Sequence, residues 1–179
     1  RYAKEFPLSV KATVSFEQTY GEIDGDSATV AETISLISAI SGIPVKQGIA
    51  ITGSMSQKGE VQTVGGITEK VEGFFRVCKQ SGLTGEQGVI IPEGNYDSLI
   101  LDDEILESVK QKQFSIWTVE TIEEAIEIIM DKKAGLKNKN GNFPRGSVNY
   151  HLIKKLSEVH KKILEEHDSD GIKEKEEKN

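Results

Sequence analysis

The apolar positions near the start of the chain change from a strand period to a helix period. In residues 8–16, LSVKATVSF, every second side chain is apolar, which is typical of a half-buried strand. In residues 27–41, Val30, Ile34 and Ile37 recur at helical spacing, and Gly42 and Pro44 follow as stop signals. The pattern predicts a strand over residues 8–16 and a helix that begins near residue 27.

Strand and helix patterns continue to alternate further along the chain. Helices are predicted at residues 68–82, 102–112 and 121–130, the last with a capping box from Thr121 to Glu124. In the second of these, Ile105, Leu106 and Val109 should face inward. Short strands are predicted by GIAITGS (48–54), GEVQTV (59–64), GVIIP (88–92) and FSIWTV (114–119). The alternation predicts an α/β or mixed α+β sheet domain.

A change in composition divides the chain near residue 131. We expect one domain over residues 1–131 and a polar linker rich in Gly and Asn over residues 132–146. A C-terminal helix is predicted over residues 147–167, and the charged residues 168–179 are expected to be disordered. The apolar side of that helix would be Leu152, Leu156, Val159 and Ile163.

Charge and composition exclude several classes of function. The 179 residues carry a net charge of −7 and no basic stripe mixed with aromatics, which argues against a nucleic-acid partner. A single cysteine excludes an internal disulfide, and Cys78 lies in an apolar stripe that predicts a core position. No apolar run is long enough to span a membrane, so we expect a cytoplasmic protein. Because the chain begins at Arg1, we also expect it to be a piece of something longer.

The stretch GDSA, around Ser27, raises the question of chemistry. A serine before a helix is most often an N-cap. It can also be a nucleophile, since the positive end of the helix and its backbone N–H groups would stabilise an oxyanion. His151, His160 and His167 all lie beyond the linker, so a Ser-His-Asp triad would require the last helix to fold back. Neither metal-ligand spacings nor a phosphate-binding P-loop occurs, so no metal or cofactor is predicted.

Lys70 is the remaining candidate base. It lies in the first turn of the helix that follows Gly65 and Gly66. There the positive end of the helix opposes its charge, and burial would add to this by favouring the neutral amine. The alternative interpretation is an ordinary surface lysine.

Taken together, these stretches resemble the proteolytic domain of the Lon protease family, in its B-type and Lon-like branches. The resemblance rests on GDSA at residues 25–28, AITG at 50–53 and GEVQTVGGITEK at 59–70, in the family's order and at similar spacing. It runs from about Phe6 to about Met130, and FPRGSVN (143–149) is similar to a stretch found after the domain in some bacterial relatives.

The resemblance implies a Ser-Lys dyad, with Ser27 as nucleophile and Lys70 as general base. Thr52 matches the threonine whose hydroxyl lies near the lysine amine, and Asp26 matches the acidic neighbour of the serine in the B-type branch. Backbone N–H groups near Ser27 and Ala28 would hold the oxyanion. Glu22 and Asp24 are further acidic residues with no assigned role.

The implied function is that of a serine endopeptidase acting on unfolded polypeptides. The resemblance further implies homo-oligomerisation as a six-membered ring, and ATP and magnesium would act only through an AAA+ module that this chain does not contain. Two alternatives stay open at this point. One is a non-catalytic interaction domain of the same fold, and the other is a different Ser-Lys amidohydrolase.

Overall fold

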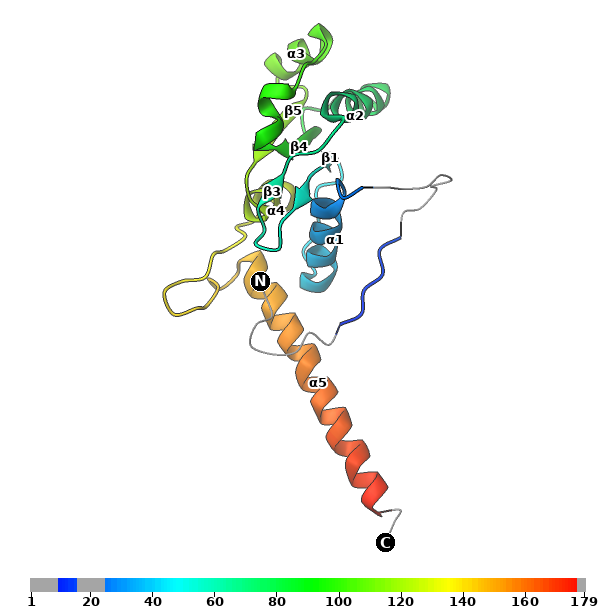
Figure 1. Cartoon of the computed structure of the whole chain (residues 1–179), viewed down its shortest axis with the longest axis vertical. Helices are drawn as coiled ribbons and strands as arrows, with labels where there is room; N and C mark the ends of the chain where they lie inside the picture. Colours follow the sequence, from blue (N-terminus) through cyan, green and yellow to red (C-terminus); the bar gives the residue numbers. More distant parts are fainter. Residues whose placement is uncertain (1–9, 16–24, 177–179) are drawn as a thin grey trace.

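A computed structural model describes residues 10–15 and 25–176 of the chain, with side chains through residue 165. Figure 1 shows a body of helices and short strands from which one long helix projects. The elements are α1 Thr29–Ser41, β1 Ile49–Ile51, β2 Ser54–Met55, β3 Val61–Gln62, α2 Ile67–Ser81, β4 Gly88–Pro92, the 3₁₀ turn η1 Glu93–Ser98, α3 Asp103–Lys110, β5 Ser115–Val119, α4 Ile122–Met130 and α5 Val148–Glu176. The predicted mixed α+β fold is confirmed.

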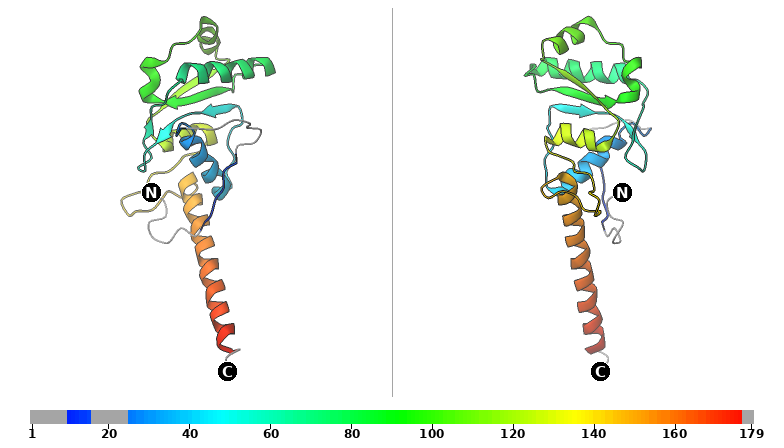
Figure 2. Two further views of the ribbon diagram at one scale, coloured as in Figure 1. Left: turned by 45° about the vertical axis from the view of Figure 1, so that its right-hand side comes forward. Right: turned by 90° about the vertical axis from the view of Figure 1, so that its left-hand side faces the viewer.

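The centre of the fold is a parallel sheet with helices on both faces. Its strand order is β1-β4-β5, while β2 and β3 form a separate antiparallel pair. Alternate residues of the fully buried strand β4 enter different cores: Ile90 packs with α1, α4 and α5, whereas Val89 and Ile91 pack with α2 and α3. Figure 2 shows the same layers, with α2 and α3 on one side of the sheet and α1, α4 and α5 on the other.

Local signals set the ends of the helices as the sequence predicts. Gly42 ends α1 in the left-handed conformation at φ 72°, and its N–H bonds to the Ser38 carbonyl. Thr121 and Glu124 form the predicted capping box at the start of α4. Cys78 is buried in the α2 core, where burial raises the pKa of its thiol, so its predicted core position is confirmed.

The C-terminal helix is longer than predicted and is partly integrated into the core. Leu152 and Leu156 of α5 are buried with α1 and α4, whereas Val159 is partly exposed. The helix continues past residue 167 to Glu176, through residues expected to be disordered, and only its last part, with Lys and Glu at residues 173–176, has good helix propensity. The division of the chain into domain and linker stays a prediction.

Two expectations from periodicity are wrong. Residues 10–15 of the predicted strand 8–16 form no strand, and the rest of that segment lies outside the described residues. Alternation alone does not make a strand, since a strand also needs a hydrogen-bonded neighbour. Leu106, predicted to face inward, is 41% exposed, because the short helix α3 covers the core through Ile105 and Ser108.

The close pairing of β4 and β5 makes a prediction about Gly88. A Cβ at Gly88 would overlap the Ser115 carbonyl and the Trp117 ring, while one at Gly73 on α2 would meet nothing within 4 Å. We expect Gly88→Ala to destabilise the fold by about 1–3 kcal/mol through overpacking. Gly73→Ala should instead stabilise it by about 0.5–1 kcal/mol through helix propensity. Urea unfolding of both variants measures the two effects, and equal midpoints would contradict the strand register.

Candidate active site

The chain that leaves β1 holds Ser27 at the start of α1. The Ser27 carbonyl accepts two hydrogen bonds, from the Gly53 N–H at 2.8 Å and from the Thr52 hydroxyl at 3.2 Å. The Gly53 carbonyl in turn accepts the Val30 N–H at 3.1 Å. We call these three bonds the Ser27 clamp. The carbonyl of the candidate nucleophile therefore points into the fold.

Ser27 is not the helix N-cap. The cap residue of α1 is Ala28, and no side chain caps the helix. Within the part of the chain that the structure describes, the Ser27 hydroxyl and the N–H groups of Ser27 and Ala28 have no hydrogen-bond partner. The N-cap interpretation is wrong, and a half-buried hydroxyl lies beside two N–H donors at the positive end of a helix.

Asp26 has a partner that the sequence did not reveal. Its carboxylate accepts the Ser54 hydroxyl at 2.7 Å, and its main-chain carbonyl accepts the Thr29 N–H and hydroxyl. Ser54 is buried at the start of β2, although Asp26 itself is exposed. The only sequence signal for Ser54 was its place directly after AITG. Ser54 thus ties the residue before the nucleophile to the antiparallel strand pair.

Lys70 lies in the first turn of α2, as predicted. Asn95, just past the end of β4, bonds both the N–H and the carbonyl of Val64 at 3.0 Å, and so fixes the loop that leads into α2. Asn95 is buried, and sequence reasoning missed it. Since Thr52 follows β1 and Asn95 follows the neighbouring parallel strand β4, the loops that lead into α1 and α2 are both fixed at the carboxyl-end edge of the sheet. That edge, at the carboxyl ends of the strands, is where open α/β sheets bind ligands.

The structure brings Ser27, Thr52 and Asp26 together but does not bond Lys70 to them. Lys70 is exposed, and within the described residues its amine has no hydrogen bond or ion pair. The exposure of Lys70 in this isolated chain agrees with the alternative of a surface lysine, and the burial that would favour a neutral amine is not seen. The Thr52 hydroxyl, expected to lie near the lysine amine, donates instead to the Ser27 carbonyl.

Other chemistry has little support in the described residues. No group of three or more His, Cys, Asp and Glu side chains there is arranged to hold a metal. Nor is any helix among them long and apolar enough to cross a membrane. His151 packs edge-on against the Tyr150 ring on α5.

Comparison with known proteins identifies the family. The model of the Lon protease (S16) C-terminal proteolytic domain matches residues 18–132. A Lon protease homolog of Escherichia coli (strain K12) is 48% identical over 128 residues, which are 72% of this chain and 22% of the relative. The archaeal Lon protease of Archaeoglobus fulgidus is 40% identical over 129 residues, which are 70% of this chain and 19% of the relative.

The chain spans about a fifth of the length of these relatives. The match covers α1 to α4 and both sheets, including Ser27, Thr52 and Lys70. The chain therefore belongs to the Lon protease family and corresponds to its C-terminal proteolytic domain.

Proposed function

We propose that this domain is a serine endopeptidase with a Ser27-Lys70 dyad. The observation that carries the proposal is the Ser27 clamp, which turns the Ser27 carbonyl inward and leaves its hydroxyl and two N–H groups without partners at the start of α1. The membership of the Lon family supports a peptidase. Lys70 supports it by its place in the first turn of α2, directly after a loop that is fixed at the same edge of the sheet.

The proposed reaction begins when neutral Lys70 takes the proton of the Ser27 hydroxyl while the serine oxygen attacks a peptide carbonyl. The N–H groups of Ser27 and Ala28 stabilise the resulting oxyanion, a contribution typically worth about 3 kcal/mol per donor. Lys70 then gives the proton to the leaving amine, and an acyl ester forms on Ser27. Water cleaves this ester, again with Lys70 as base, and restores the serine.

The substrate we propose is an extended, unfolded polypeptide. Among the described strands β1 pairs with β4 on one side only, and Thr52, which bonds Ser27, directly follows its last residue, Ile51. An extended chain added to such an edge gains main-chain hydrogen bonds whatever its side chains are. A bound substrate would also remove water from Lys70, which the isolated chain leaves exposed.

We also propose that the domain works as a hexameric ring in the cytoplasm and needs no cofactor of its own. ATP and magnesium would enter only through an ATPase module elsewhere in the full-length protein. A ring would confine a loosely specific site, and head-to-tail contacts close such a ring when the rotation between neighbours divides the circle.

One alternative has an observation in its favour. A non-catalytic interaction domain of the same fold predicts an exposed Lys70 that is not bonded to Ser27, which is the arrangement seen here. Labelling with a serine-reactive phosphonate separates the two proposals, because only an activated Ser27 reacts. Cleavage of an unfolded protein then separates a protease from a small-amide hydrolase.

The first prediction for the proposed site concerns its base, Lys70. Lys70→Arg keeps the charge but cannot give up a proton, so we expect peptide hydrolysis to fall by about 10²- to 10⁴-fold. Lys79→Arg in the last turn of the same helix is the matched control and should stay active, since its ion pair with Glu104 needs only a cation. Hydrolysis of an unfolded protein substrate measures both variants.

Ser27→Ala completes this test and should abolish the activity. Because Ser27 provides no cap bond, the fold should remain, as circular dichroism would show. Turnover by Ser27→Ala would exclude the proposed nucleophile, whereas an active Lys70→Arg would show that Lys70 supplies charge alone.

A second prediction concerns Thr52. Thr52→Val removes the hydroxyl that bonds the Ser27 carbonyl but leaves the Gly53 bond, so kcat should fall by up to about tenfold. Thr52→Ser keeps the hydroxyl and should retain most of the activity. Steady-state kinetics with a peptide substrate would reveal the difference, and unchanged kinetics in Thr52→Val would remove Thr52 from the site.

A third prediction concerns the bond between Ser54 and Asp26. Ser54→Ala removes the 2.7 Å hydrogen bond and should lower kcat with little change in KM, because the loop before Ser27 loses a fixed point. Asp26→Asn keeps an oxygen for Ser54 and should lose less. Equal kcat values in Ser54→Ala and the unchanged domain would show that this bond does not position Ser27.

A further inference from the structure

A groove beside the start of α5 is positively charged although the chain as a whole is acidic. The groove has a volume of about 660 Å³ and is lined by Lys137, Arg145 and Lys154, with no carboxylate. Phe143, Tyr150 and Ile153 give it apolar surface. We call it the basic groove.

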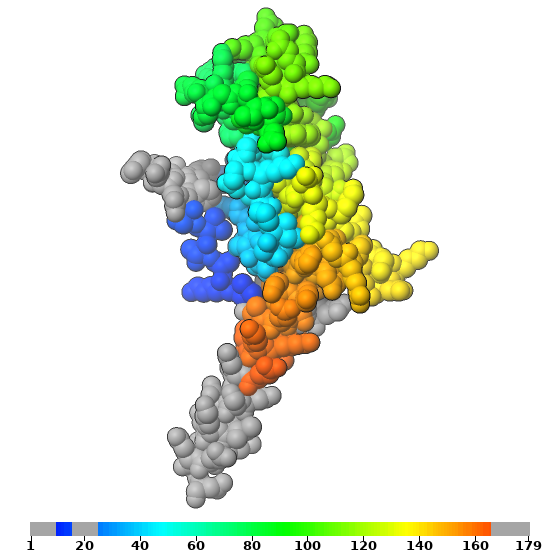
Figure 3. Space-filling view, turned by 180° about the vertical axis from the view of Figure 1, so that it is seen from behind, coloured from blue at the N-terminus to red at the C-terminus, as the bar shows by residue number. Residues whose placement is uncertain are grey.

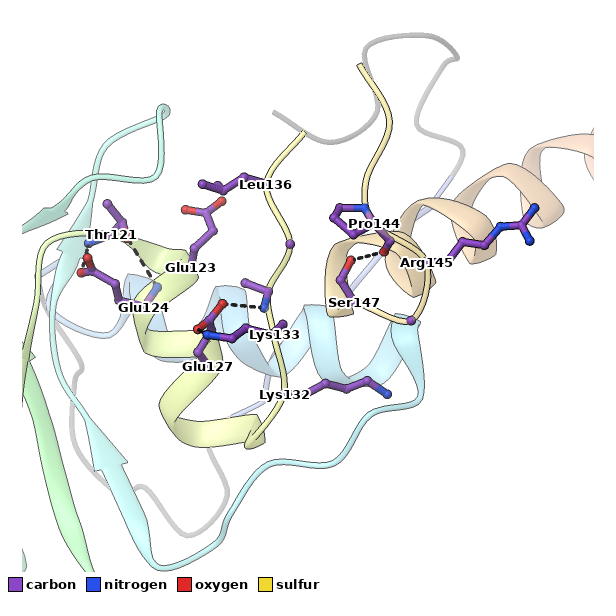
Figure 4. Close-up of a pocket in the computed structure, with 13 residues that line it drawn as sticks. Thr121, Glu123, Glu124, Glu127, Lys132, Lys133, Leu136, Pro144, Arg145 and Ser147 are labelled. Atoms are coloured by element: carbon purple, nitrogen blue, oxygen red, sulfur yellow. Dashed lines mark hydrogen bonds and ion pairs between the residues drawn. The ribbon is translucent and has the colours of Figure 1, made fainter. Parts of the chain in front are cut away.

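Of the three cations in the basic groove, only Lys154 has an ion pair among the described residues, with Glu158 at 3.9 Å. Among the described residues Lys137 and Arg145 have no ion pair, although the Lys137 amine lies 5.4 Å from the centre of the Phe143 ring. By contrast, Lys133 bonds Glu127 in the neighbouring cavity, and this bond holds the pKa of Glu127 below its ordinary value. Figure 4 shows that Arg145 points away from that cavity and over α5. The groove therefore presents positive charge to a partner.

The far end of the same molecule has the complementary surface. Residues 93–107, which we call the acidic head, contain six acidic side chains and no basic one. Two large apolar side chains stand out among the carboxylates, Tyr96 at 64% exposed and Ile100 at 78%. Of the six acids, Glu104 alone has an ion pair within the described residues, with Lys79. An apolar knob ringed by acids matches a groove with apolar walls ringed by cations.

The two surfaces lie on opposite sides of the sheet. α3 packs on the core of α2, whereas the chain before α5 packs through Ala134 on the core of α1 and α4. Figure 3 shows the green region that contains the acidic head at one end of the domain. The yellow and orange region that contains the basic groove lies toward the other end. One copy therefore cannot fill its own groove with its own head, but a second copy can.

We propose that the acidic head of one copy docks in the basic groove of the next copy. This inference rests on the proposed function, because it supplies the head-to-tail contact for the proposed ring. Ile100 enters between Phe143 and Ile153, while Asp97 and Asp103 face Lys137 and Arg145. Such a contact joins two different patches, so it repeats from copy to copy and closes a ring when the rotation permits.

The experiment reverses the charges of the acidic head in one variant of the whole chain and those of the basic groove in another. Analytical ultracentrifugation over a concentration series then measures how strongly each variant associates. Asp97→Lys/Asp103→Lys and Lys137→Glu/Arg145→Glu should each weaken association by at least roughly tenfold, because like charges then face each other. A 1:1 mixture of the two variants should regain association, since each groove again meets a head of opposite charge. An alternating ring also requires an even number of subunits.

Controls separate this contact from general charge effects and from activity. Lys161→Glu/Lys162→Glu on α5 changes the net charge as much as the groove variant does and should leave association unchanged. Ser27→Ala should associate like the unchanged chain, so a failure of the proposed peptidase would not affect this test. The unchanged chain should dissociate as salt rises from 0.05 M to about 0.5 M, where charges are screened over a few ångströms.

Three outcomes would overturn the proposal. If the reversed variants associate as the unchanged chain does, the contact lies elsewhere, and the ring proposal stands without it. If the mixture associates no better than either variant alone, or if the unchanged chain is a monomer at the highest concentration, the head does not dock in the groove.

Discussion

The position of the candidate nucleophile depends on two hydrogen bonds to a single main-chain oxygen. Because the Ser27 carbonyl accepts from both Thr52 and Gly53, the turn before α1 is tied to the end of β1. β1 is in turn set by its parallel register with β4, in which Ile51 lies opposite Ile90. A Cβ at Gly53 would come within 3.1 Å of Val30 and 3.0 Å of Val61, so glycine allows the close approach that the clamp needs. The close approach at Gly53 therefore affects both the position of Ser27 and the packing of the core.

The sequence predicted the parts of the fold that depend on local signals. Periodicity located α2, β4 and β5, while Gly42 and the Thr121 capping box marked helix ends. The prediction from periodicity failed where a strand depends on a hydrogen-bonded neighbour. Residues 10–15 have the alternation of a strand but no neighbouring strand among the described residues. Composition was also misleading at α5, which extends to Glu176 through residues typical of disorder.

In the candidate site, too, some residues could be predicted from the sequence and others could not. Ser27, Lys70 and Thr52 were found because their residue types and spacing match a family pattern. Ser54 and Asn95 were missed because each acts through hydrogen bonds to residues 28 and 31 positions away, and no local pattern indicates such a bond. Asn95 holds the loop before Lys70 much as Thr52 holds Ser27. Ser27 and the loop before Lys70 are thus each positioned by a polar side chain that follows a different strand of one sheet.

The lack of a bond between Ser27 and Lys70 has a physical consequence for the proposed dyad. Burial favours a neutral amine, so the proposed role of Lys70 as a base requires something to exclude water from a side chain that is exposed here. The isolated chain does not do so, and no acidic side chain among the described residues pairs with Lys70 and would have to be displaced. A substrate laid along β1 would cover this edge of the sheet, so desolvation of the base and positioning of the peptide carbonyl would occur in one step. If catalysis depends on substrate binding in this way, the site would be inactive while it is empty. Folded proteins that present no extended strand would then not be cleaved.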